Sequence, residues 1–137
     1  MSKKILVVDD EPDAIDFIGT ILNDNGYEYF SAQNGVEGLK LARERRPDLI
    51  LLDLIMPEKS GIMMFQELKK DPSLREIPII VVSGASEVTG VDFKNFLFKL
   101  TSQEKTEEKS YFGPDDFVEK PVNPDELIEV IKKVLKE

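Results

Sequence analysis

The sequence lacks histidine, cysteine and tryptophan, and the first two absences exclude whole classes of site. Without histidine the chain supplies no Ser-His-Asp triad, no imidazole base or metal ligand, and no phosphohistidine. Without cysteine it forms no disulfide and no thiolate zinc site. Long apolar runs are also missing, so no segment is predicted to span a bilayer, and the apolar run 5–8 is too short for a signal peptide. We therefore expect a cytoplasmic protein.

Basic residues are few: 18 Lys and Arg stand against 27 Asp and Glu in 137 residues, which gives a formal net charge of −9. Binding to a nucleic-acid duplex needs basic side chains that replace its counterions, so we expect no direct nucleic-acid partner and no membrane partner. The hydrophobic fraction of 41% and the charged fraction of 33% are typical of folded globular proteins. The length predicts a single domain over residues 1–137.

Short apolar runs alternate along the chain with segments whose apolar residues recur at helical spacing. In one such segment, 36–45, the spacing predicts that Val36, Leu39 and Ala42 face inward. The run 49–53 is apolar at every position before its terminal Asp, as in a central strand of a parallel sheet. The expected strands are residues 4–8, 27–32, 49–53, 78–82 and 117–119. Helices are expected between Glu11 and Gly26, over 36–45, after Ser60, over a short segment near Phe93, and from the Asn123 cap to Leu135.

This alternation predicts an α/β fold, because strands joined by helices make right-handed crossovers in a doubly wound parallel sheet. The ligand site of such a sheet lies at the carboxyl ends of its strands. Polar side chains occur at these ends. Asp9 and Asp10 end the first predicted strand and Asp53 the third, whereas Ser83 and Lys120 follow the fourth and fifth.

These five side chains form a coherent chemical set. Three converging carboxylates repel one another unless protons or a cation are present, and oxygen ligands select a hard divalent ion. We expect Mg²⁺, with Mn²⁺ as a second candidate. Lys120 adds a fixed positive charge and Ser83 a hydroxyl donor, and together these groups suit an anionic phosphoryl group.

At this point the chain resembles a known family, the CheY-like receiver domains of two-component response regulators. The matching fragments occur in the right order from one end of the chain to the other. They are residues 7–11, 51–57 with Gly61 beyond, 82–85, 113–117, and Lys120-Pro121. The resemblance implies a flavodoxin-like sheet of five parallel strands in the order 2-1-3-4-5, with helices on both faces. It also implies a phosphorylation-dependent switch. Because the last predicted helix ends the chain within a few residues of Leu135, we expect no separate output domain.

The resemblance assigns roles to the charged residues. Asp53 matches the phosphoacceptor, which receives its phosphoryl group from the phosphohistidine of a sensor histidine kinase or a histidine phosphotransfer protein. Asp10, Asp53 and the main-chain carbonyl of Ile55 match ligands of Mg²⁺, and Asp9 joins them directly or through water. Lys120 matches the lysine that pairs with the acceptor and then with a phosphoryl oxygen.

Two further residues match the parts that respond to phosphorylation. Ser83 corresponds to the hydroxyl residue that shifts toward the phosphoryl group, and Phe117 to the aromatic switch that follows it. A role for Phe117 in the core alone is the alternative. The bond between Lys120 and Pro121 is expected to be cis. The signal would pass to an unidentified downstream protein, with the chain a monomer or a weak, phosphorylation-dependent dimer.

The chain departs from a compact receiver between Ser83 and Lys120, where it carries roughly fifteen additional residues, centred on 91–112. This insertion could extend a helix, form a loop, or create a docking surface from aromatic residues such as Phe93 and Phe96. We hypothesise a docking surface, although a tolerated insertion costs little loop entropy.

Other functions lack residues that they need. A phosphohydrolase with an aspartyl nucleophile, of the haloacid-dehalogenase type, needs an acid two residues after Asp53, where this chain has Ile55. A nucleotide or flavin binder needs a glycine-rich loop where this chain has Asp9 and Asp10. A pseudo-receiver, which is a constitutive interaction module, would be favoured if any of Asp10, Asp53 or Lys120 were replaced, and none is.

In the family that this chain resembles, the positions of Ile55 and Ala85 help to set the access of water to the acyl phosphate. Because both residues are apolar here and cannot orient an attacking water, we also expect a long-lived phosphoryl group.

Overall fold

The computed structural model describes residues 3–54, 61–83 and 114–137, with the backbone alone at Ser83. The strands are β1 (Lys4–Val8), β2 (Glu28–Ala32), β3 (Leu49–Leu52), β4 (Ile79–Ser83) and β5 (Asp116–Glu119). The helices in the described ranges are α1 (Pro12–Asp24), α2 (Gly35–Arg45), α3 (Gly61–Lys70) and α6 (Pro124–Leu135). Within those ranges no helix combines bilayer-spanning length with an apolar sequence.

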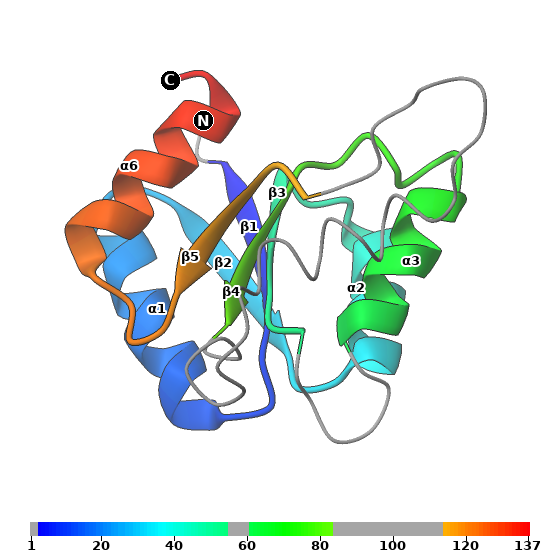
Figure 1. Ribbon diagram of the computed structural model, residues 1–137, viewed down its shortest axis with the longest axis horizontal. Coiled ribbons are helices and arrows are strands. Elements are labelled where there is room, and N and C mark those ends of the chain that lie inside the picture. Colours follow the sequence, from blue (N-terminus) through cyan, green and yellow to red (C-terminus); the bar gives the residue numbers. More distant parts are fainter. Residues whose placement is uncertain (1–2, 55–60, 84–113) are drawn as a thin grey trace.

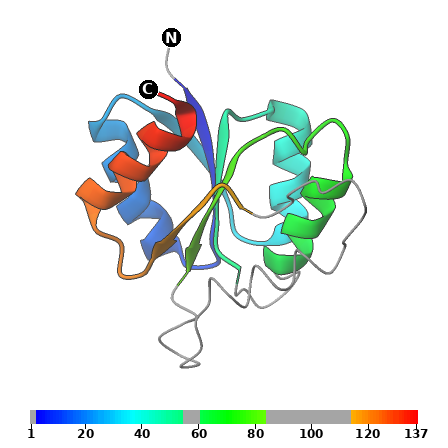
Figure 2. The ribbon, with the colours of Figure 1, turned by 45° about the horizontal axis from the view of Figure 1, so that its top comes forward.

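All five strands form one sheet in the order β2-β1-β3-β4-β5, and every neighbouring pair is parallel. Helices α1 and α6 cover one face of the sheet, and α2 and α3 cover the other (Figure 1 and Figure 2). The predicted doubly wound fold and its strand order are therefore confirmed. The reversal of strand order beside β1 places the carboxyl ends of β1 and β3 next to each other, where such sheets bind their ligands.

The three central strands are buried on both faces, because helices cover each side of the sheet. Leu6 and Val8 point into the core beneath α2 and α3, whereas Ile5 and Val7 point into the core beneath α1 and α6. Each fully buried aliphatic side chain contributes about 1.5–3 kcal/mol relative to an exposed one. The central strands are therefore packed between two hydrophobic cores on opposite sides of one sheet.

The prediction that Val36 faces inward is wrong, since this side chain is 63% exposed. Leu39 and Ala42 are buried as predicted, together with Gly35 and Gly38. The buried face of α2 is thus centred on small residues, and Val36 lies about 100° around the helix from Gly35. Small residues allow α2 to approach α3 and β1 closely, and the larger valine is left at the flank.

Asparagine side chains begin two of the helices. The predicted cap at Asn123 is confirmed, because its Oδ1 accepts a 3.0 Å hydrogen bond from the Glu126 N–H. Asn34 Oδ1 accepts a 2.8 Å bond from the Glu37 N–H in the same way, and Pro124 occupies the first turn of α6. Each cap satisfies an N–H group that the helix itself leaves unpaired.

Several predictions concern residues outside the described ranges. The insertion at 91–112 and Ala85 fall within residues 84–113, and the main-chain carbonyl of Ile55 falls within 55–60. These expectations stay predictions.

Candidate functional site

The register of the sheet brings Asp9 and Asp53 side by side. Val8 pairs with Leu52 in the β1–β3 ladder, and each aspartate is the residue that follows its strand. The Asp53 N–H donates to Val8 O at 3.0 Å, and the Asp9 N–H donates to Ala32 O at 3.1 Å. The backbone of both residues is therefore held by bonds that extend beyond the last residues of the strands.

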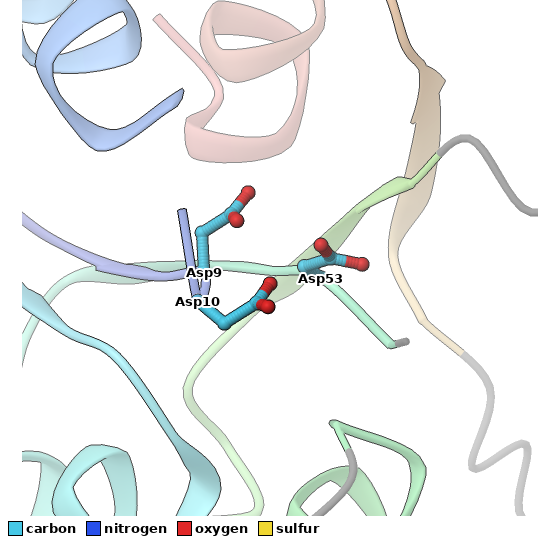
Figure 3. A group of neighbouring side chains, drawn as sticks. All are labelled: Asp9, Asp10 and Asp53. Carbon is cyan, nitrogen blue, oxygen red and sulfur yellow. The ribbon is translucent and has the colours of Figure 1, made fainter. Parts of the chain in front are cut away.

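Three carboxylates converge at this edge of the sheet. One carboxylate oxygen from each of Asp9, Asp10 and Asp53 lies within 4.8 Å of the other two. Asp9 and Asp53 are only 2% and 7% exposed, so water screens their charges poorly. Figure 3 shows the Asp10 carboxylate directed toward Asp53 from the neighbouring strand end. The arrangement concentrates negative charge, as the sequence predicted.

Lys120 supplies the positive charge of the site, and it contacts two of the carboxylates. Its Nζ donates to Asp9 Oδ2 at 2.7 Å and to Asp53 Oδ2 at 3.2 Å, and its peptide bond to Pro121 is cis. Burial alone would lower the pKa of Lys120, but the hydrogen bond to Asp9 and the charges of Asp53 and Asp9 outweigh it. The pKa of Lys120 is therefore raised, and the ammonium stays charged at neutral pH.

Asp9 is held from two sides. Its Oδ2 accepts the bond from Lys120, and its Oδ1 accepts a 3.0 Å bond from the Glu11 N–H. The carboxylate plane is therefore fixed between a backbone group of its own segment and a side chain from the far end of the chain. Asp9 in turn limits where the Lys120 ammonium can lie.

The donor set of the site fits a magnesium ion. Mg²⁺ prefers carboxylate oxygens and retains several waters, and three such oxygens lie within 4.8 Å of one another here. The single ammonium of Lys120 leaves an excess of formal negative charge among the three carboxylates, which a divalent cation would offset. Asp9, Asp10 and Asp53 are the described residues that could hold it.

The two predicted response residues lie on neighbouring strands. Ser83 ends β4, where its backbone is in register with Glu119 of β5. Phe117 is half-buried and packs against the core beneath α2 and α3. The structure thus brings together Asp9, Asp10, Asp53 and Lys120, and it places Ser83 at a strand end of the same sheet without describing its side chain.

Two backbone features of the site were not predicted. The Glu11 N–H anchors Asp9, and the Gly61 N–H donates to the carbonyl oxygen of Leu54, the residue after Asp53, at 3.2 Å. Gly61 could have been found from the sequence, since this glycine lies just beyond the matching fragment 51–57. Its role depends on how closely α3 approaches β3, which spacing along the chain does not show.

Known proteins match this chain over nearly its whole length. A model of the response regulator receiver domain family matches residues 5–104. The chain is 33% identical to the polar-differentiation response regulator DivK of Brucella anthropi over 135 residues, which cover 98% of each protein. It is 31% identical to the protein PilH of Pseudomonas aeruginosa over 132 residues, which cover 96% of this chain and 97% of PilH.

Solved structures agree with this match. A CheY-like response regulator receiver domain protein from Methanospirillum hungatei JF-1 superposes with a TM-score of 0.78 at 29% identity, covering 99% of this chain and 95% of that one. The receiver domain of a sensor histidine kinase from Pseudomonas aeruginosa PAO1, solved with a magnesium ion in its active site cleft, has a TM-score of 0.78 at 23% identity, with all of both chains covered. The second likeness supports the fold alone. By sequence match and by strand order, the chain belongs to the response regulator receiver domain family, the phosphorylation-dependent switches of two-component signalling.

Proposed function

We propose that Asp53 is the phosphoacceptor of this receiver and that it takes its phosphoryl group from a phosphohistidine on another protein. One observation carries the proposal: the Asp53 carboxylate, at the end of β3, contacts the Lys120 ammonium and lies beside the carboxylates of Asp9 and Asp10. Receiver domains of two-component systems are phosphorylated by histidine kinases. A partner is needed because this chain has no histidine of its own.

The transfer is an in-line displacement at phosphorus. A carboxylate oxygen of Asp53 forms the new P–O bond, and the P–N bond to the donor imidazole breaks with its electron pair on nitrogen. The products are an acyl phosphate on Asp53 and a free imidazole on the partner. The reaction adds negative charge where Asp9 and Asp10 already place it, so cations at the site are essential.

Lys120 is the cation that the chain itself provides. Before transfer it is held between Asp9 and Asp53, at 2.7 and 3.2 Å. After transfer the ammonium remains within reach of a phosphoryl oxygen, because its bond to Asp9 holds it in place. Ser83 then supplies a hydroxyl to the phosphoryl group, and Phe117 changes its packing in response.

Mg²⁺ is the proposed metal, with Mn²⁺ as a substitute. Asp10, Asp53 and the main-chain carbonyl of Ile55 would hold it directly. Asp9 would contact it through water, since both of its oxygens already accept hydrogen bonds. When bound, the ion offsets the charge that develops on the transferring phosphoryl oxygens.

The proposed activity is a switch and not turnover of an external substrate. Ile55 stands where a phosphohydrolase with an aspartyl nucleophile needs its second acid, so the acyl phosphate persists and can be read by a partner. The chain is proposed to act as a single receiver domain in the cytoplasm, where ATP is available for the phosphorylation of histidine kinases. Signalling proceeds by contact with a downstream protein, as a monomer or as a weak dimer after phosphorylation.

The test is phosphorylation by a small phosphodonor with Mg²⁺, followed by intact mass. We expect a single phosphoryl adduct on the wild type and none on Asp53→Asn. Asp24→Asn, which neutralises an exposed aspartate at the end of α1, is the matched control and should retain the adduct. A chain that takes no phosphoryl group from a small donor or from any histidine kinase would be a constitutive interaction module instead.

A further inference from the structure

The first residue of α3 lies directly against the backbone that carries Asp53. Gly61 is buried, and its N–H donates to Leu54 O at 3.2 Å. A Cβ atom at position 61 would lie 2.6 Å from Leu54 Cα and 2.9 Å from Asp53 C, and it would overlap the Asp53 carbonyl oxygen. The atoms in the way are backbone atoms of the two residues that follow β3.

This crowding differs from that at Gly38, a buried glycine of the neighbouring helix α2. At Gly38 of α2, a Cβ atom would lie 2.8 and 2.9 Å from Sδ and Cε of Met64, the far end of a flexible side chain. Met64 can adjust its rotamer to make room. The backbone at Asp53 cannot move aside as easily, because the Asp53 N–H donates a hydrogen bond to Val8 O in the sheet.

Any side chain at position 61 would therefore separate α3 from the end of β3 or push the Asp53 backbone away. The Asp53 carboxylate lies beside the carboxylates of Asp9 and Asp10, which follow β1, and it accepts a 3.2 Å bond from the Lys120 ammonium, which follows β5. A displacement of a few tenths of an ångström to 1 Å at the Asp53 backbone would change these distances directly. Misplacements of about 1 Å can cost up to about a hundredfold in rate.

We propose that Gly61 is a positioning residue for phosphoryl transfer: its missing side chain allows α3 to pack against the Asp53–Leu54 backbone and so sets the Asp53 carboxylate against Lys120. The inference rests on the proposed function of Asp53. It adds a residue that touches neither the phosphoryl group nor the metal and acts only through the backbone.

The experiment compares Gly61→Ala with Gly38→Ala. Three quantities are measured for the wild type and both variants. They are the maximal phosphorylation rate at saturating small phosphodonor and Mg²⁺, the urea unfolding midpoint by circular dichroism, and the Asp53–Lys120 distance in a crystal structure. Both variants should unfold at lower urea concentration than the wild type, because both add a methyl group to a packed position.

We expect the maximal rate to fall by at least about tenfold in Gly61→Ala and by less than about twofold in Gly38→Ala. The Asp53 Oδ2 to Lys120 Nζ distance should exceed the present 3.2 Å only in Gly61→Ala. Three results would overturn the inference: an unchanged distance in Gly61→Ala, an equal loss of rate in both variants, or a Gly61→Ala chain that does not fold, which would assign Gly61 to the fold alone. A wild type that takes no phosphoryl group would refute the proposed function of Asp53. The Asp53–Lys120 distance would still show whether Gly61 positions the Asp53 carboxylate.

Discussion

Lys120 Nζ donates a 2.7 Å hydrogen bond to Asp9 Oδ2, a shorter contact than its 3.2 Å bond to Asp53. The two residues are 111 positions apart and come from the ends of β5 and β1. Asp9 is 2% exposed and is anchored by the Glu11 N–H, so it gives the long lysine side chain a fixed partner. Asp9 thus holds the ammonium beside Asp53, the proposed acceptor.

Removal of the Lys120 charge should slow phosphorylation of Asp53. We expect Lys120→Met to lower the maximal rate of phosphorylation by a small phosphodonor by about a hundredfold. In this variant no ammonium stabilises the negative charge of the transferring phosphoryl group. Lys133→Met is the matched control, since Lys133 forms a 2.8 Å ion pair with Asp116 on the surface. Its rate should equal that of the wild type. A Lys120→Met chain that is phosphorylated normally would show that Lys120 only stabilises the fold.

Binding of Mg²⁺ should stabilise the protein through Asp10. At a Mg²⁺ concentration ten times its dissociation constant, the free energy of unfolding should rise by about 1.4 kcal/mol. Asp10→Asn should raise the stability of the metal-free protein by about 1 kcal/mol, because it relieves repulsion among three carboxylates, and should reduce the gain with Mg²⁺. Urea unfolding with and without Mg²⁺ measures both effects.

An exposed acid on α1 provides the control for that measurement. Asp13→Asn should leave the gain with Mg²⁺ unchanged, since Asp13 lies outside the carboxylate cluster. An Asp10→Asn variant that gains as much stability from Mg²⁺ as the wild type would place the metal elsewhere.

Tyr27 should contribute to stability in a way that is lost at alkaline pH. Its hydroxyl donates to Glu137 Oε1 at 2.9 Å, and burial, this bond and the Glu137 charge raise the pKa of Tyr27 to about 12, from a usual value of 10.0. The folded state holds the phenolic proton more tightly than the unfolded state does. The stabilisation is therefore complete below pH 10 and is lost as pH rises toward 12.

Urea unfolding between pH 9 and pH 12 (roughly the window of this titration) tests the effect of Tyr27. The free energy of unfolding should fall more steeply for the wild type than for Tyr27→Phe, with Glu137→Gln between them, since burial still acts on Tyr27 in that variant. If the free energy of unfolding fell equally with pH in the wild type and in Tyr27→Phe, ionisation of Tyr27 would not contribute to the loss of stability at alkaline pH.

Gly19 provides the space for Tyr29 of the edge strand β2. A Cβ atom at position 19 would lie 2.6 Å from Cε1 of Tyr29 and would overlap the hydroxyl end of its ring. We expect Gly19→Ala to lower the free energy of unfolding by about 1–3 kcal/mol. In a Tyr29→Ala background the same change should stabilise α1 by up to about 1 kcal/mol, because alanine favours a helix more than glycine does. Equal effects in both backgrounds would exclude this contact as the cause.

Much of this fold could be predicted from local patterns. Apolar runs such as 49–52, alternating with helical segments, predicted a parallel doubly wound sheet, because only strands covered on both faces are apolar throughout. The same alternation placed Asp9, Asp10 and Asp53 at one edge of the sheet, as the structure shows. Helical spacing failed at Val36, because periodicity identifies a face but not how far the neighbouring elements extend over it.

The sequence by itself determined the strand order, through its family resemblance, and the residues that meet at the strand ends, through their positions after apolar runs. Only the tertiary structure decided which hydrogen bonds and packing contacts those residues make. Three contacts of a few ångströms show this. They are the hydrogen bond between Lys120 and Asp9, the hydrogen bond from the Glu11 N–H to Asp9, and the close approach of Gly61 to Asp53. Such distances depend on how two cores pack against one sheet, and no periodicity along a chain encodes them.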